Sequence, residues 1–344
     1  MSNTTIMDVA RTAKVSKATV SRVLNNSPFV DQNTKEHVLA VIEELKYSPS
    51  ATARSLSKRE SSIIGMIVPE VDNPFFGDVM RGVTEVIERN NLMLICCNTD
   101  DDRGNDIKAL GMLKEHRVRG LLYTPAIDYS EEEEQKELKT VLEDLDIPVV
   151  LMDRLISSLD LDGICFDDSE AMYQATLALL NAGHTKIGII NGTMDRVLAR
   201  IRQAGYIKAL EEKGIAPNEK YMFFGNLRMT KAYELSKQLL DLEDLPTAVL
   251  TCNNRTTLGF LKALYEKKMS LDDIVCIGLD RIEPIDIINA DLNYIKRDAR
   301  EMGRRAIEML LDRILHPDKP IQKVVLDTPL VIKNMNKRTE VGKA

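Results

Sequence analysis

The stretch IMDVARTAKVSKATVSRVLN, residues 6–25, places its apolar residues at helical spacing in two short runs separated by a turn. The first run covers residues 6–13. The second covers residues 17–24 and follows Ser16, a residue type that suits the start of a helix. A third amphipathic run lies at about residues 34–45. The pattern predicts three short helices that close one small core, in the order of a helix-turn-helix.

The second run presents short or cationic side chains that can reach the base edges and phosphates of DNA. They are Lys17, Ala18, Ser21, Arg22 and Asn25. Residues 1–60 contain nine Lys or Arg and six Asp or Glu, a net charge of +3, which leaves −10 for residues 61–344 out of a total of −7. Charge and helix count alone are equally consistent with a small three-helix bundle that has no DNA role.

A length of 344 residues predicts two or three domains, and a composition of 44% hydrophobic and 29% charged residues is typical of soluble globular proteins. No apolar run approaches the roughly 20 residues that a membrane-spanning helix needs. The sequence MSNTTIMDVA at the start has no secretory apolar segment. We therefore expect a cytoplasmic protein.

From residue 63 onward the pattern changes to short apolar runs that alternate with amphipathic stretches of helical length. The predicted strands are residues 63–68, 92–97, 120–124, 148–152, 163–166, 186–190, 248–252 and 274–278, and the clearest helices are 79–90, 171–182 and 299–315. Such alternation predicts parallel sheets covered by helices. Because the segment is too long for one comfortable core, we expect two doubly wound α/β subdomains.

The sequence contains no recognisable catalytic motif. A phosphate-binding G-x-x-x-x-G-K-[ST] loop, a G-x-G-x-x-G turn after a strand and a G-x-S-x-G nucleophile turn are all missing. The four histidines, His37, His116, His184 and His316, do not have the spacing of metal ligands. We therefore expect a protein that is not an enzyme and that uses no metal and no cofactor.

Residues 6–25, together with Val30 to Thr34 and Tyr47-Ser48-Pro49-Ser50, resemble the head of the LacI/GalR (lactose/galactose repressor) family. The resemblance implies that Lys17, Ala18 and Arg22 read bases in the major groove. It also assigns DNA contacts to Thr5, Ser16, Thr19, Ser21 and Asn25, which would contact phosphates and fix the register. The family usually has Gly in the turn where this chain has Lys14. If that turn requires a positive φ, Lys14 adopts it at a cost of about 1 kcal/mol.

Residues 49–61, PSATARSLSKRES, permit a helix too short to be stable alone in water. Taken in isolation they also fit a simple interdomain linker. The resemblance implies a hinge helix that folds on operator DNA, with Ala53 and Arg54 near the groove. Leu56 matches the apolar residue that the family wedges into the minor groove, where it bends the duplex. In a dimer, two Leu56 side chains would meet at the centre of a near-palindromic site.

For residues 62–340 the resemblance implies a periplasmic-binding-protein-like body of two subdomains that share three crossings of the chain. The crossings are expected near residues 159–162, 290–293 and 320–323, which gives an N-subdomain of about 62–160 and 292–321 and a C-subdomain of about 162–290 and 322–340. An effector would then bind in the cleft at the carboxyl ends of the strands.

The family's effector-facing positions fall on six residues of this chain: Phe75, Phe76, Arg154, Arg202, Asn253 and Asp280. Either phenylalanine fits a ligand face or the core equally well, and Arg202 also fits a solvated helix position. Acceptors with forked guanidinium donors suit a sugar. Several further arginines near the expected cleft suggest an anionic ligand, such as a sugar acid or a sugar phosphate.

The sequence thus predicts a helix-turn-helix head at residues 1–48, a hinge at 49–61 and an effector-binding and dimerisation core at 62–340. We expect an allosteric, homodimeric regulator, most simply a repressor of carbohydrate catabolism genes. Two alternatives share the same body: a cytosolic sugar-binding protein, and an α/β enzyme without a DNA role. The first lacks a reason for the added head, and the second lacks a recognisable catalytic set.

Overall fold

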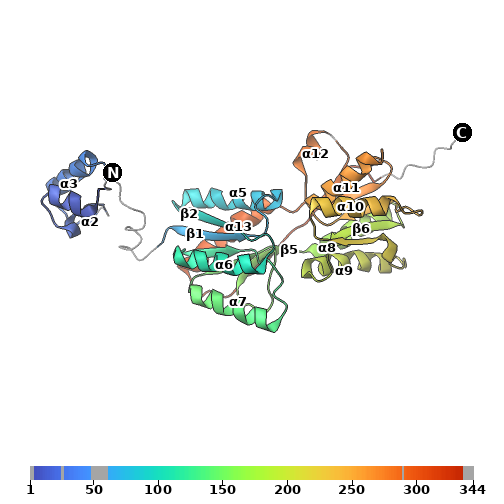
Figure 1. Ribbon diagram of the computed structural model, residues 1–344, viewed down its shortest axis with the longest axis horizontal. Helices are drawn as coiled ribbons and strands as arrows, with labels where there is room; N and C mark the ends of the chain where they lie inside the picture. The colour runs from blue at the N-terminus through green and yellow to red at the C-terminus, as the bar shows by residue number, and fades with distance from the viewer. Residues whose placement is uncertain (1–3, 25–26, 48–60, 289, 336–344) are drawn as a thin grey trace. The chain divides into compact units, whose positions relative to one another are not determined.

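The computed structural model describes residues 4–24, 27–47, 61–288 and 290–335. The chain forms two compact units, residues 1–61 and residues 62–344. We call the first unit the head and the second the body. Figure 1 shows the elements of each unit along the chain.

The head consists of α1 (Ile6–Thr12), α2 (Lys17–Leu24) and α3 (Gln32–Glu44), which confirms the three predicted helices. Seven buried side chains form its core: Val9, Ala10, Ala13, Val20, Val23, Val38 and Val41. Each helix begins at a polar side chain that accepts a hydrogen bond from the first turn. Thr5 and Asp8 form a reciprocal cap on α1. Ser16 Oγ accepts from the Thr19 amide at 3.1 Å, and Asp31 accepts from Thr34.

Lys14 lies in the turn between α1 and α2 with φ of 53°. The turn thus requires the positive φ that glycine, the usual residue of the LacI/GalR family here, adopts freely. A residue with a Cβ, such as Lys14, is sterically strained in this conformation. The turn nevertheless keeps its shape, since the Val15 amide donates to the Ala10 carbonyl at 3.0 Å.

The body contains two lobes, each built on a six-stranded sheet. The first lobe has the strand order β11-β5-β4-β3-β1-β2, and all its strand pairs are parallel. Its strands are β1 (Ile63–Val68), β2 (Met93–Asn98), β3 (Gly120–Tyr123), β4 (Val149–Met152), β5 (Asp162–Phe166) and β11 (Lys323–Leu326).

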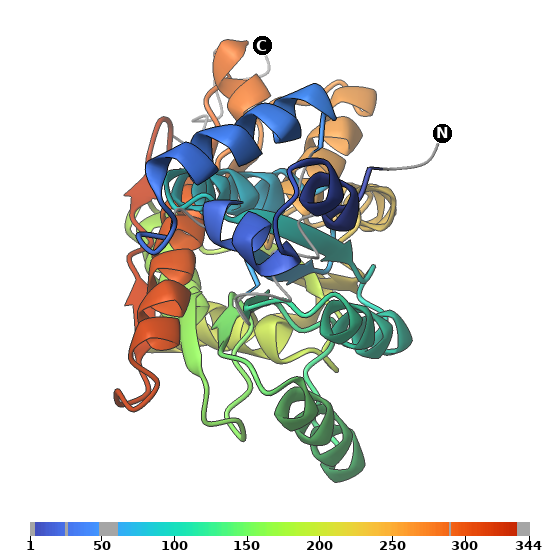
Figure 2. The ribbon, with the colours of Figure 1, turned by 90° about the vertical axis from the view of Figure 1, so that its left-hand side faces the viewer.

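Helices cover both faces of the first sheet. Buried residues of α5 (Pro74–Arg89) and α13 (Ala299–Leu315) form the core on one face, and those of α6 (Arg103–Glu115) and α7 (Glu132–Leu145) form the core on the other. Figure 2 shows α13 in red and α7 in green on opposite sides of this lobe. The axes of α5 and α13 approach closely because Gly82 faces α13. A Cβ there would lie 2.0 Å from the Arg300 carbonyl oxygen.

The second lobe has the strand order β12-β10-β9-β8-β6-β7, and only the β10–β12 pair is antiparallel. Its strands are β6 (Ile187–Gly192), β7 (Met222–Gly225), β8 (Ala248–Thr251), β9 (Val275–Leu279), β10 (Asn293–Ile295) and β12 (Leu330–Val331). Its helices are α8 (Asp168–Asn181), α9 (Val197–Glu212), α10 (Met229–Leu240), α11 (Asn254–Glu266) and α12 (Glu283–Ile287), with a 3-10 turn η1 (Glu219–Tyr221). Helices α8 and α9 cover one face, and α10 and α11 cover the other.

The expected places of the three crossings between lobes are wrong by a few residues each. Strand β5 belongs to the first sheet, so the chain first crosses after Phe166 rather than near residues 159–162. Strand β10 belongs to the second sheet and β11 to the first, so the other crossings lie at 296–298 and 327–329. The apolar pattern predicted β5 but not the sheet it joins, and it did not predict the short strands β10 and β11. All three strands pair with a sheet before the chain leaves it.

Candidate functional site

The predicted DNA-contacting residues of the head that the structure describes lie on or beside α2. Ser16, Lys17, Ala18 and Arg22 are exposed, and Thr19 and Ser21 are half-buried. Thr5 is exposed at the start of α1, where its hydroxyl bonds to Asp8 Oδ2 at 2.7 Å. The other four predicted DNA contacts, Asn25, Ala53, Arg54 and Leu56, lie outside the described residues.

The exposed part of α2 combines a helix N-terminus with two cationic side chains, Lys17 and Arg22. The partial positive charge of a helix N-terminus attracts phosphate, and the short Ala18 side chain allows the backbone to come close to a base pair. Val20 and Val23, on the opposite side of α2, are buried against the rest of the head. The helix is therefore held by one face while the other is presented to solvent.

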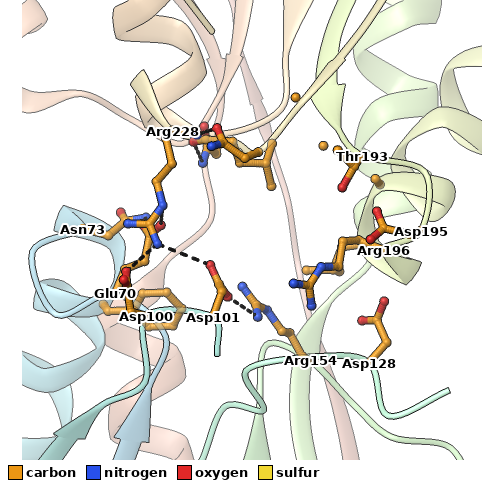
Figure 3. A pocket seen from close by; sticks show the side chains of 18 residues that line it. Glu70, Asn73, Asp100, Asp101, Asp128, Arg154, Thr193, Asp195, Arg196 and Arg228 are labelled. Carbon is orange, nitrogen blue, oxygen red and sulfur yellow. Dashed lines mark hydrogen bonds and ion pairs between the residues drawn. The ribbon is translucent and has the colours of Figure 1, made fainter. Parts of the chain in front are cut away.

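A cavity of about 320 Å³ lies in the body between the two lobes. Residues that follow β1, β2, β3 and β4 line it from the first lobe, and residues that follow β6, β7 and β8 line it from the second. Its polar and charged lining includes Glu70, Asn73, Asp100, Asp101, Asp128, Arg154, Thr193, Asp195, Arg196, Asn226, Arg228 and Asn253 (Figure 3). The carboxyl ends of parallel strands are where open α/β sheets place ligands. We call this cavity the interlobe pocket.

Arg228 joins the two lobes on one side of the interlobe pocket. It precedes α10 in the second lobe, and its guanidinium lies 2.8 Å from Glu70 and 2.8 Å from Asp100 of the first lobe. Nearby, the side-chain amide of Asn254 donates to Asn73 Oδ1 at 2.8 Å, again from one lobe to the other. These polar contacts join the lobes along this rim, and Figure 3 shows the pairs of Arg228 with Glu70 and Asp100.

Arg154 and Arg196 lie on the other side of the pocket. Arg154 Nη1 donates to Asp101 at 2.7 Å and to the carbonyls of Pro125 and Ala126 at 3.0 Å each. Arg196, from the second lobe, donates to the same Ala126 carbonyl at 3.3 Å. The backbone carbonyls of the loop after β3 thus accept hydrogen bonds from guanidinium groups of both lobes.

The charges that line the pocket do not match the excess of arginine expected from the sequence. Five carboxylates and three guanidiniums line it among the described residues. Three other arginines near the expected cleft do not line the pocket and each pairs with an acidic group, although Arg255 also lies 3.3 Å from the pocket residue Glu70. Arg202 binds Asp168, Arg255 binds Asp72, and Arg281 binds Asp286. The structure therefore gives no support to an anionic ligand through surplus positive charge.

The six residues predicted to face an effector fall into two groups. Phe76, Arg154 and Asn253 line the interlobe pocket. Asn253 also caps α11 by accepting from the Thr256 amide at 2.7 Å. Phe75, Arg202 and Asp280 do not line the pocket but are buried beside it, where each contacts another buried group.

These buried residues belong to a cluster of charges centred on Arg297, which we call the buried charge cluster. Arg297 binds Asp280 through two nitrogens, and its guanidinium lies 4.4 Å from the centre of the Phe75 ring. Arg202 binds Asp168 at 2.8 Å and the Cys252 carbonyl at 2.9 Å. Asp153 completes the cluster at 3.4 Å from Arg297, and burial raises the pKa of its carboxyl group.

Sequence reasoning missed two of the residues that matter most here, Arg228 and Arg297. Arg228 follows β7, a four-residue strand that was not predicted, so the rule that sites follow strand ends was never applied there. Glu70 and Asp100 follow predicted strands, and the same rule would have found them. Arg297 lies in the second crossing, which was placed several residues too early.

Family comparisons cover almost the whole chain. Residues 5–50 match the family described as "Bacterial regulatory proteins, lacI family", and residues 61–337 match "Periplasmic binding proteins and sugar binding domain of LacI family". No helix among the described residues is long and apolar enough to cross a membrane.

Two curated relatives are similar to this chain over nearly its whole length. The chain is 37% identical to the HTH-type transcriptional repressor PurR of Haemophilus influenzae strain PittEE, over 93% of this chain and 94% of the relative. It is 34% identical to the ribose operon repressor of Haemophilus influenzae strain Rd, over 96% and 97%. These relatives are transcriptional repressors rather than enzymes, which confirms the expectation that the chain is not an enzyme.

A solved structure extends the similarity to the fold. The Lac repressor dimer bound to operator and the anti-inducer ONPF matches with a TM-score of 0.83 and 25% identity, over 97% of this chain and all of that one. The predicted fold class, a helix-turn-helix head with two α/β subdomains, is thereby confirmed. The chain is therefore a member of the LacI family of bacterial regulatory proteins.

Proposed function

We propose that the protein is a transcriptional repressor that binds near-palindromic operator DNA as a homodimer and responds to a small polar effector in the interlobe pocket. The observation that carries the effector part is the pocket itself, because charged side chains from both lobes converge on one cavity of about 320 Å³. Pockets for small ligands commonly begin at about 300 Å³. The relatives, a repressor named PurR and a ribose operon repressor, support the role as a repressor.

The head performs the DNA step in this proposal. Lys17, Ala18 and Arg22 contact base edges in the major groove, while Thr5, Ser16, Thr19, Ser21 and Asn25 contact the backbone and set the register. Leu56 inserts at the centre of the operator, with Ala53 and Arg54 beside it. The head's charge of +3 supports phosphate binding, and a dimer doubles that charge over one operator.

The effector best supported by the pocket chemistry is a neutral sugar. Carboxylates such as Asp101 and Asp128 accept hydrogen bonds from hydroxyl groups, and guanidiniums such as Arg154 and Arg228 donate to them. Phe76 is the one aromatic side chain among the pocket-lining residues, so a flat base would have a stacking partner on one side only. The excess of carboxylates disfavours sugar acids and sugar phosphates.

Effector binding would change the operator affinity by shifting the equilibrium between arrangements of the two lobes. Both lobes contribute charged groups to the pocket, so a ligand that contacts both favours one arrangement over others. In a dimer, that shift changes the separation of the first lobes and with it the placement of the hinges on DNA. We propose control of carbohydrate catabolism genes as the biological output.

The DNA-binding proposal is tested by selecting duplexes from a random pool with the full chain and then measuring gel-shift affinities for the selected site. Lys17→Ala and Arg22→Ala are expected to weaken sequence-specific binding about 10- to 100-fold. Lys35→Ala removes the same charge from α3 and is expected to change affinity only a few-fold. Equal affinity of Lys17→Ala, Arg22→Ala and the parent protein would reject the proposed recognition surface.

The effector proposal is tested by calorimetric titration with ribose, cellobiose, gluconate, ribose 5-phosphate and guanine, followed by gel shifts in the presence of each ligand that binds. A neutral sugar is expected to bind and to change operator affinity. Arg154→Gln and Arg228→Gln are expected to weaken its binding at least tenfold, whereas Arg281→Gln, outside the pocket, leaves it unchanged. Binding of a sugar phosphate or of guanine in preference to the neutral sugars would contradict the proposed ligand class.

A further inference from the structure

A fully buried carboxylate, Asp106 of α6, lies next to the interlobe pocket without lining it. Its Oδ2 atom accepts three hydrogen bonds: from the Tyr123 hydroxyl at 2.6 Å, from the Tyr129 hydroxyl at 2.7 Å and from the Ala126 amide at 3.1 Å. Three donors on one oxygen are what an ionised carboxylate accepts, and hydrogen bonds to a charged group are stronger than neutral ones. Asp106 therefore binds the residue before one loop, Tyr123, and the middle and the end of that loop, Ala126 and Tyr129.

That loop, residues 124–129, connects the end of β3 with the segment before α7 and contributes to the pocket. The carbonyls of Pro125 and Ala126 accept from Arg154 of the first lobe, and the Ala126 carbonyl also accepts from Arg196 of the second. The Asp128 carboxylate accepts from the Val197 amide, at the start of α9 in the second lobe, at 2.5 Å. The same loop thus positions a pocket arginine and contacts the opposite lobe.

Backbone pairing holds the start of the loop, where the Thr124 amide donates to the Ile67 carbonyl at 3.0 Å, while the middle and the end of the loop bond to a side chain. Tyr129 has φ of 46°, a left-handed conformation that a bulky residue adopts only when its surroundings enforce it. Its side chain is buried, with 1% of its surface exposed, and its hydroxyl ends on Asp106. The Ala126 amide has the Asp106 carboxylate as its acceptor rather than another peptide group. The Asp106 carboxylate therefore stabilises the strained Tyr129 conformation and also satisfies the buried Ala126 amide.

Electrostatics link Asp106 to the pocket as well. Burial raises the pKa of Asp106, while the two tyrosines, the Ala126 amide and the charge of Arg154 oppose that rise. Burial and the nearby carboxylate together raise the pKa of Tyr129, which keeps its hydroxyl protonated as a donor. The charge of Arg154 thus favours the ionised form of Asp106, against the larger effect of burial.

We propose that Asp106 is a positioning residue for the interlobe pocket: its carboxylate fixes loop 124–129, which in turn sets the positions of Arg154 and Asp128. The description of the pocket as an effector site rests on the proposed function, but the geometry of the loop does not. Residues that never touch a ligand would then determine how well the pocket binds one, since a small displacement of a polar partner weakens a hydrogen bond steeply.

The test is backbone hydrogen exchange, resolved to single amides, in the full-length protein without any ligand. In Asp106→Ala, exchange of the Ala126 and Val197 amides is expected to rise about tenfold, the effect of losing one or two buried hydrogen bonds. Asp106→Asn keeps a carbonyl oxygen as acceptor and is expected to restore part of the protection. Tyr129→Phe is the fallback variant in case Asp106→Ala fails to fold. It removes one donor and leaves the carboxylate in place, so it is expected to give a smaller rise in exchange at both amides.

The matched control is Tyr206→Phe, which removes another buried tyrosine hydroxyl bond, to the Ile187 carbonyl at 2.8 Å, in the second lobe. It is expected to leave the Ala126 amide unchanged. Unchanged exchange at Ala126 and Val197 in the Asp106 variants overturns the proposal. So does an equal rise at amides throughout the first lobe, which would indicate a general loss of stability. Because no ligand is used, failure to find an effector cannot be mistaken for failure of this inference.

Discussion

Arg297 holds Asp280 in a two-pronged ion pair, with Nε 2.7 Å from Oδ1 and Nη2 2.9 Å from Oδ2. Asp280 follows β9 in the second lobe, and Arg297 lies in the second crossing between the lobes. Asp153, after β4 of the first lobe, and Asp168, at the start of α8, lie 3.4 and 3.6 Å from the same guanidinium. One cation thus connects three acidic groups that come from both lobes.

Replacing Arg297 with alanine is expected to lower the free energy of unfolding by about 3–5 kcal/mol, because it leaves buried carboxylates without their partner. Although burial disfavours a charged guanidinium, Asp280 and Asp168 hold the pKa of Arg297 above its usual value, so the native side chain carries its charge. Urea denaturation of the full chain, followed by circular dichroism, measures the difference.

Arg281→Ala is the matched control, because Arg281 also pairs with an aspartate but is 53% exposed. Exposed pairs contribute about 1 kcal/mol or less. Similar losses in the two variants would mean that Arg297 contributes only as a surface charge does.

The sequence predicted the order and type of most elements, because long amphipathic helices and buried parallel strands have strong periodicity. It predicted β5 but not the sheet that β5 joins, since pairing is set by distant parts of the chain, and it did not predict the short strands β10 and β11. The same limit explains the site. The family resemblance placed Arg202 and Asp280 near the ligand cleft, but their buried partners, Asp168 and Arg297, are not neighbours in sequence and could not be read from a local pattern.

Lys14→Gly is expected to stabilise the head by about 1 kcal/mol, since glycine adopts the φ of 53° at this turn without steric strain. Hydrogen exchange of the α1 and α2 amides in the full chain should slow about fivefold. Lys35→Gly, inside α3, removes the same side chain where φ is helical and is expected to speed exchange by a similar factor. Faster exchange in both variants would show that the Lys14 side chain has a stabilising contact that outweighs the strain.

Asp153 is expected to make the stability of the body fall as the pH rises above its ordinary pKa of 3.8. Burial raises the pKa of this carboxyl group, and Arg297, Arg154 and Arg202 only partly oppose the effect of burial and of nearby Asp168. The native state therefore binds more protons than the unfolded chain between 3.8 and the raised value, so the free energy of unfolding decreases across that interval and then levels off.

The measurement is urea denaturation of the parent protein and of Asp153→Asn at a series of pH values from 3.5 upward, at constant ionic strength. The difference in unfolding free energy, parent minus variant, is expected to fall with rising pH. Asp144→Asn, on the exposed surface of α7, serves as the control and should show no such fall. A difference that rises with pH would mean that the surrounding arginines outweigh burial and lower the pKa of Asp153.

Arg228→Ala is expected to loosen the contact between the lobes without disturbing loop 124–129. Its ion pairs with Glu70 and Asp100 join the lobes at one rim of the pocket, and their partial exposure limits the loss to about 1 kcal/mol, or about fivefold in the closed population. The Val197 amide, which donates across the lobes to Asp128, should then exchange about fivefold faster, while Ala126, held by Asp106 within the first lobe, keeps its protection.

Lys231→Ala, which removes an exposed cation that pairs within α10, should change neither amide. A rise at Ala126 as large as at Val197 would mean that the loop opens with the lobes, and no rise at Val197 would mean that the Arg228 pairs do not hold the lobes closed.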